Sequence, residues 1–67
     1  MAVARVTEIT AGSSESFEAA IRTGIERASK TLDNIQQAWV KDQYVVLDGD
    51  RIGEYRVSMK LSFVLRD

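Results

Sequence analysis

Apolar and polar side chains alternate along residues 55–66 near the C-terminal end of the chain. The apolar members of this alternation are Tyr55, Val57, Met59, Leu61, Phe63 and Leu65. Successive side chains of a β-strand point to opposite faces, so a period of two predicts a strand with one face in a core. A sheet that contains this strand is therefore the first expectation for the fold.

A second strand and a turn precede this run. Residues 35–47 predict a strand, and Asp48-Gly49-Asp50 is typical of a tight turn that joins two strands of a hairpin. With Gly49 and Asp50 as the turn residues, Gln43 is expected opposite Arg56 and Trp39 opposite Lys60, unless a bulge shifts the register. On this strand, one face is expected to carry Ala38 and Val40, and the other Gln37, Trp39, Lys41 and Gln43.

The N-terminal half predicts a strand and a helix. Residues 2–10 are rich in β-branched side chains and predict a strand that Ala11 and Gly12 end. A helix is expected to begin at Ser13 or Ser14, because a serine hydroxyl can accept from the free amides of a helix start. Its apolar stripe consists of Phe17, Ala20, Ile21, Gly24, Ile25, Ala28 and Leu32. Asp33 and Asn34 are expected to end the helix.

Glycine in the apolar stripe of a helix indicates close packing. Gly24 costs about 1 kcal/mol relative to Ala in a helix interior, so another element is expected to approach it closely. The core where helix and sheet meet is expected to include Phe17, Ile21, Ile25 and Val57.

The predicted fold is α+β with the order β-α-β-β, in which a three-stranded antiparallel sheet wraps around one long helix. Residues 1–67 are expected to form a single domain. One helix covers only one face of such a sheet, so the second face must be polar or must meet a partner. Its composition is typical of a wet interface or a ligand pocket. The expected members of this face are Gln37, Trp39, Lys41, Arg56, Ser58 and Lys60.

A chain of 67 residues without cysteine or histidine lacks the usual means of stabilising a small domain. Disulfides, Cys/His zinc sites and histidine-dependent catalytic triads are excluded, so association with further copies is the remaining means. A net charge of −1 gives no basic excess for nucleic-acid binding. No apolar run reaches the roughly 20 residues that span a bilayer, so no membrane partner is expected and the cytoplasm is the expected location.

The available side chains do not predict catalysis. The acidic candidates near strands are Glu8, Asp42 and Glu54, but no spacing brings two of them together, so no enzymatic activity is expected. Trp39 is either an interface anchor or a stacking surface for a planar ligand. Arg56 and Lys60 could meet a ligand phosphate or a carboxylate of a neighbouring subunit, and the sequence leaves these alternatives open.

The distributed pattern of residues 13–40, together with the strand at 55–65, resembles the dodecin family. The matching residues of the first stretch are Ser13, Glu15-Ser16-Phe17, Ala19-Ala20, Ile25, Arg27-Ala28, Thr31, Asp33-Asn34, Ala38 and Val40. The resemblance implies a hollow, spherical homododecamer. It also implies that flavin-binding members stack isoalloxazine rings between tryptophans at a subunit interface, and store or scavenge flavin without turnover.

Two positions depart from that family pattern. The resemblance places the stacking tryptophan at Gln37 and the flavin-contacting glutamine at Arg56, while Asp42 matches a polar pocket position. Trp39 lies two residues from Gln37, about 7 Å along a strand, and could partly replace the missing ring. The chain thus resembles dodecins that lack the flavin-stacking tryptophan, for which other ligands or ions are candidates.

The resulting prediction is a non-enzymatic small-ligand-binding and storage protein that forms a homododecamer. Its candidate ligand is a flavin (riboflavin, FMN or FAD), and no metal ligands are assigned. The alternative is a structural cage that binds a phosphate-bearing cofactor or a cation. The candidate binding residues are Gln37, Trp39, Asp42, Arg56 and Lys60.

Overall fold

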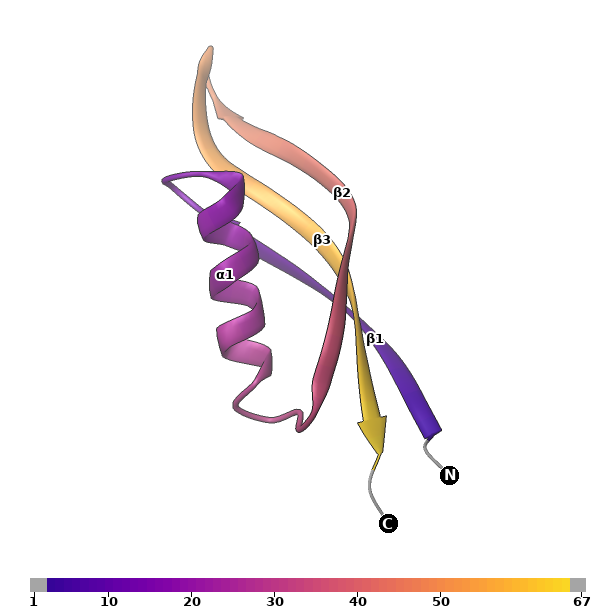
Figure 1. Ribbon diagram of the computed structural model, residues 1–67. Helices are drawn as coiled ribbons and strands as arrows, with labels where there is room; N and C mark the ends of the chain where they lie inside the picture. Colours follow the sequence, from indigo (N-terminus) through magenta and orange to yellow (C-terminus); the bar gives the residue numbers. More distant parts are fainter. Residues whose placement is uncertain (1–2, 66–67) are drawn as a thin grey trace.

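The computed structural model describes residues 3–65 and has one helix and three strands in that range. Their order is β1 (Val3–Ser13), α1 (Phe17–Ala28), β2 (Ile35–Asp48) and β3 (Arg51–Leu65) (Figure 1). This order confirms the predicted β-α-β-β fold. Ala2 and Arg66, which the sequence assigned to strands, lie outside the described residues.

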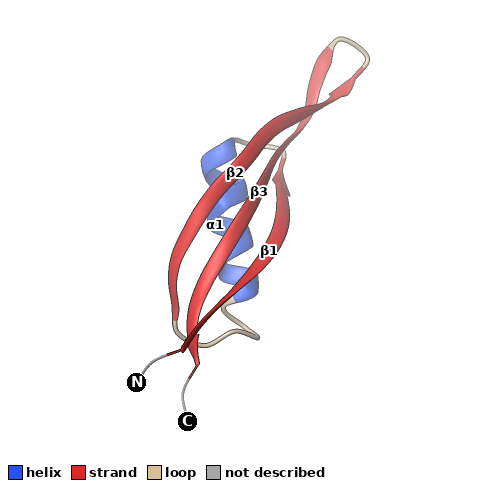
Figure 2. Ribbon diagram, turned by 90° about the vertical axis from the view of Figure 1, so that its right-hand side faces the viewer, coloured by secondary structure: helices blue, strands red, loops and turns tan. Residues whose placement is uncertain are grey.

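The strands form one antiparallel sheet in the order β1-β3-β2. The chain leaves β1, crosses through α1 to the far edge of the sheet as β2, and returns through a hairpin as the central β3. Figure 2 shows α1 lying across one face of the sheet, where it packs against β1 and β3. The opposite face has no helix over it among the described residues.

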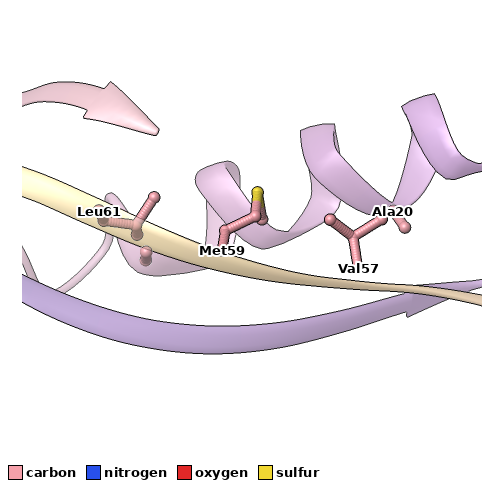
Figure 3. Packing of buried hydrophobic residues seen from close by; sticks show 5 residues of the cluster. Ala20, Val57, Met59 and Leu61 are labelled. Carbon is pink, nitrogen blue, oxygen red and sulfur yellow. The ribbon is translucent and has the colours of Figure 1, made fainter. Parts of the chain in front are cut away.

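The core lies between α1 and the central strand (Figure 3). Val57, Met59 and Leu61 of β3 are fully buried together with Ala20 of α1, which confirms the alternation read from the sequence. Phe63 continues the buried row with 9% of its surface exposed.

Partly buried helix side chains surround this cluster. Phe17, Ile21 and Ile25 pack against it without being fully enclosed. The ring of Phe17 meets the ring of Tyr55 edge-on, with centroids 5.1 Å apart. The core assignment of these helix residues is therefore confirmed, but Val57 is the more completely buried partner.

The helix is shorter than predicted at both ends. Its N-cap is Ser16, whose hydroxyl accepts from the amide of Ala19 at 3.0 Å, whereas Ser13 accepts from the amide of Glu15 in the preceding turn. The expected start at Ser13 or Ser14 is wrong because β1 itself runs to Ser13. Ala11 and Gly12 do not end β1, since both continue its ladder with β3.

The C-terminal end of the helix also lies inside the predicted range. The last helical residue is Ala28, with Ser29 as the C-cap, so Asp33 and Asn34 do not end it. Leu32 lies in the connection to β2 and still packs against the core. Asn34 has a φ of 61°, a left-handed conformation that asparagine tolerates better than most residues, and β2 begins directly after it.

Gly24 lies where α1 comes closest to the sheet. A Cβ at this position would lie 2.8 Å from the terminal methyl group of Met59 and 2.9 Å from the Cβ of Ala11. The prediction of a close approach is confirmed. Both distances are shorter than real Cβ contacts, and the Ala11 methyl cannot move out of the way by rotation.

We expect Gly24→Ala to lower the free energy of unfolding by about 1 kcal/mol. Alanine is better than glycine in a helix by about 1 kcal/mol, but overpacking a close contact costs about 1 to 3 kcal/mol. Denaturant unfolding at a fixed protein concentration measures the net effect. Glu26→Ala, at an exposed position of the same helix, is the control and should change stability by less than about 0.5 kcal/mol. A Gly24→Ala protein more stable than the parent would contradict this account.

Among residues 3–65, no helix combines the length and the apolar character that crossing a membrane requires.

Candidate functional site

We call the sheet face turned away from α1 the outer face. Cross-strand partners in a sheet share a face, so the register identifies its members, except Lys41, which belongs to this face through its ion pair with Glu8. Those used below are Val6, Glu8, Thr10, Gln37, Trp39, Lys41, Asp42, Tyr44, Glu54, Arg56, Ser58, Lys60 and Ser62.

The β2–β3 register contains three irregularities. Gln36, Lys41 and Gly53 each have no cross-strand partner, so each is an extra residue in its strand. The turn residues are Gly49 and Asp50 as predicted, because Asp48 pairs with Arg51. Only Gly49 of the two has a positive φ, at 67°, which is the pattern of a type II′ turn.

Two of these bulges cancel one another at Trp39. The extra residue Gly53 in β3 shifts the register by one, and the extra residue Lys41 in β2 shifts it back. Trp39 is therefore opposite Lys60, as predicted. Between the bulges the prediction is wrong, since Gln43 is opposite Val57 and not opposite Arg56.

The same bulges change which β2 side chains reach the outer face. Gln43 shares the inner face with Val57, whereas Asp42 and Tyr44 are opposite Ser58 and Arg56 on the outer face. Tyr44 was missed by the sequence reasoning. A glycine within a strand often marks a bulge, so Gly53 was the signal that could have found it.

All five candidate binding residues lie on the outer face, but at different positions along the strands. We call each pair of cross-strand partners on this face one level. Trp39 is opposite Lys60, and Gln37 is opposite Ser62 at the next level. Asp42 is opposite Ser58, so the pair of Trp39 and Lys60 lies between Asp42 and Gln37 along the sheet. Arg56 is four residues from Lys60 and six from Ser62, which at 3.3 Å per residue is about 13 Å and about 20 Å. One subunit thus brings Trp39, Lys60 and Gln37 together and keeps Arg56 apart from them.

Arg56 is engaged by its neighbours. Its Nε donates to a carboxylate oxygen of Glu54. The hydrogen bond to Glu54, followed by one to Tyr44, raises the pKa of Arg56 above its ordinary value. Gly12 makes room for this pair, because a Cβ there would lie 2.7 Å from the carboxyl carbon of Glu54. The cation of Arg56 is therefore already partly neutralised.

A second ion pair crosses the outer face next to Lys60. The ammonium group of Lys41 lies 3.0 Å from a carboxylate oxygen of Glu8, and this hydrogen bond raises the pKa of Lys41 above its ordinary value. Glu8 is the cross-strand partner of Lys60 in β1. Among the outer-face residues of the described chain, Lys60 and Asp42 are the charged side chains without an ion pair.

The chemical capacity of this surface is binding. Trp39 has 66% of its surface exposed, and Lys60 beside it offers a cation and three hydrogen-bond donors. The hydroxyl groups of Thr10 and Ser58 lie 3.2 Å apart at the adjacent level. Residues 3–65 contain no group of three or more potential metal-ligating side chains of the His, Cys, Asp or Glu type.

Comparisons with known proteins agree with this fold. The dodecin family model matches residues 3–66. The dodecin from Streptomyces davaonensis is 38% identical with a TM-score of 0.94, and the match covers 98% of this chain and 97% of that chain. A mutant of the Thermus thermophilus dodecin is 30% identical with a TM-score of 0.94, and the match covers 100% of both chains.

A third solved structure is described as a calcium-chelating immunodominant antigen. This calcium dodecin from Mycobacterium tuberculosis, reported with a novel calcium-binding site, is 31% identical with a TM-score of 0.85. The match covers 96% of this chain and 91% of that chain. The comparison with curated proteins gave no match.

Proposed function

Because the chain belongs to the dodecin family of non-enzymatic small-ligand-binding proteins, we propose that it stores a planar ligand within a hollow shell of twelve identical subunits. A flavin (riboflavin, FMN or FAD) is the first candidate for this ligand. The observation that carries the proposal is the exposed ring of Trp39 beside the cation of Lys60 on the outer face. Within residues 3–65, no helix covers this face and Lys60 makes no ion pair. The proposal also places the protein in the cytoplasm.

The shell is supported by what a single subunit leaves uncovered. The chain has no cysteine to form disulfides, and α1 packs mainly against β1 and β3 on one face of the sheet. Trp39 and Val6 on the outer face have 66% and 59% of their surfaces exposed. A small domain gains stability when a partner covers such a face. Association of copies through the outer face would bury these side chains.

The distances along the sheet support a binding site that two copies share. The positions that the resemblance assigns to flavin contacts, Gln37 and Arg56, lie about 20 Å apart within one subunit, by the strand rise. A single three-ring isoalloxazine system cannot reach both. A second copy facing the first would bring its own outer face over the ligand, so ligand binding and assembly are expected to be coupled.

Trp39→Ala is expected to weaken riboflavin binding about fivefold, or about 1 kcal/mol. Stacking of aromatic rings contributes about 0.5 to 1.5 kcal/mol beyond the buried area, and alanine removes the ring. Quenching of riboflavin fluorescence measures the affinity. Gln43→Ala, on the inner face of the same strand, is the control and should leave the affinity unchanged. Equal affinities of the parent and Trp39→Ala would refute stacking on this residue.

A cation is the alternative ligand, and Asp42 is the observation that favours it. Its carboxylate is the acidic group of the outer face without an ion pair among the described residues. One carboxylate is too few for calcium, which takes six to eight oxygen ligands, so several copies would have to contribute. Titration calorimetry with calcium, and with Asp42→Asn as the matched variant, tests this alternative. A phosphate-bearing cofactor would rely on Lys60, since Glu54 already engages Arg56.

A further inference from the structure

The β2–β3 hairpin extends beyond the other elements. The pairing of β1 ends at Ser13 opposite Tyr55, so residues 46–54 have no third strand beside them. Figures 1 and 2 show the hairpin running past the N-terminal end of α1. This projection contributes to a molecule whose longest dimension is 51 Å and whose other dimensions are 19 and 13 Å.

The end of this hairpin combines apolar and acidic side chains. We call residues 47–52 the hairpin tip. Leu47 and Ile52 are direct cross-strand partners and have 61% and 52% of their surfaces exposed. Asp48 and Asp50 flank Gly49 in the turn next to them, and Arg51 is the cross-strand partner of Asp48. Asp50 is therefore the acidic side chain of the tip that is not opposite a cation. An exposed apolar pair at the end of a projecting hairpin is typical of a contact surface rather than of a free surface.

A groove between α1 and β1 has the complementary character. Its volume is about 630 Å³, and its apolar lining residues include Ile9, Ala11, Gly24, Ala28 and Leu32. Arg27 is the charged residue among those that line it. β1 is an edge strand with β3 as its one neighbour, so the other side of β1 has no strand beside it among the described residues. We call this feature the α1–β1 groove.

We propose that the hairpin tip of one subunit docks in the α1–β1 groove of a neighbouring copy. Leu47 and Ile52 pack against the apolar floor, and the acidic turn lies next to Arg27. The proposal rests on the assembly proposed above and names a contact that builds it. Two different surfaces of the same chain form this contact, so it can repeat around a closed ring or shell.

A second copy is favoured over an unrelated partner because one chain carries both halves of the contact. The apolar pair of the tip matches the apolar lining residues of the groove. Asp50, the tip carboxylate that is not opposite a cation, matches Arg27, the one basic lining side chain. Opposite charges placed across an interface fix its register and exclude wrong partners. The contact also covers the exposed apolar tip and the unpaired edge of β1, both of which favour aggregation in a free subunit.

Charge reversal tests the proposal in the full-length protein. Arg27→Glu and Asp50→Arg are each expected to raise the concentration at which the assembly dissociates by about tenfold, and the double variant should restore it. Sedimentation velocity over a dilution series measures this concentration. Lys30→Glu, which reverses a nearby exposed charge outside the groove lining, is the matched control and should behave like the parent.

Cross-linking provides a second test that does not depend on weakening the assembly. The chain has no cysteine, so Asp50→Cys and Thr23→Cys introduce unique thiols at the tip and at the groove. The two variants are mixed, assembled together and mildly oxidised. A disulfide-linked pair of one chain of each kind is expected, and Asp50→Cys mixed with Arg22→Cys, outside the groove lining, should give far less of it.

The outcomes separate this contact from the proposed function. Unchanged assembly in both single reversals, failure of the double variant to restore assembly, or equal cross-linking with both cysteine partners would overturn the docking contact. An intact oligomer in those same experiments would leave the proposed shell standing. A parent protein that sediments as a monomer would overturn both.

Discussion

Leu61→Ala is expected to lower the free energy of unfolding by about 2 to 5 kcal/mol. Leu61 is fully buried in the central strand, opposite Thr7 of β1 and Ala38 of β2. Its side chain thus lies on the helix-covered face, between the two flanking strands. Alanine would lose the transfer free energy of the removed carbons and leave a cavity that two flanking strands and a helix can close only in part.

Denaturant unfolding followed by circular dichroism measures this effect. The protein concentration must be held constant, because the stability of a self-associating protein depends on it. Leu65→Ala makes the same chemical change on the same strand at a residue with 43% of its surface exposed, and should cost much less. Similar losses in both variants would show that the buried row of β3 does not form the core.

Gln37→Trp combined with Arg56→Gln is expected to raise the affinity for riboflavin at least about tenfold, or about 1.4 kcal/mol. Gln37 lies on the outer face one level from Trp39, so a tryptophan there would add a second exposed ring. Arg56 has donors and no acceptor, whereas the edge of an isoalloxazine ring presents both. Glutamine supplies an acceptor as well as a donor, and it frees the half-buried Glu54 from its ion pair.

Fluorescence titrations of riboflavin against the parent, the two single variants and the double variant separate these contributions. Gln43→Trp is the matched control, because it adds the same ring to the inner face of the same strand. The gain should require the assembled protein, since positions 37 and 56 are too far apart to share one ring within a subunit. Equal affinities of the parent and the double variant would show that a ring at position 37 and an amide at position 56 add nothing to the binding that Trp39 provides.

The central strand was the most predictable part of the molecule. Its alternation identified the buried residues of β3 because a strand packed under a helix on one face must follow a period of two. Gly24 was also predictable, since a glycine in a helix interior is costly unless another element needs the space. The order of the elements followed from these patterns and from the turn at Gly49 and Asp50.

The helix ends and the site were less predictable, because they depend on which serine caps the helix and on single extra residues in the strands. Ser13, Ser14 and Ser16 can all cap a helix, and the choice of Ser16 depends on how far β1 pairs with β3. The faces of Asp42 and Tyr44 depend on single extra residues in a ladder, which a simple alternation does not reveal. Trp39 was placed correctly opposite Lys60 because two bulges compensate at that point.

The oligomeric mass of the parent protein tests the central claim most directly. Twelve chains of 7.5 kDa have a mass of about 90 kDa. Native mass spectrometry or sedimentation equilibrium at micromolar concentration is expected to give this mass, and dissociation is expected to be accompanied by loss of ligand binding. A folded 7.5 kDa monomer that still binds riboflavin at that concentration would contradict the account.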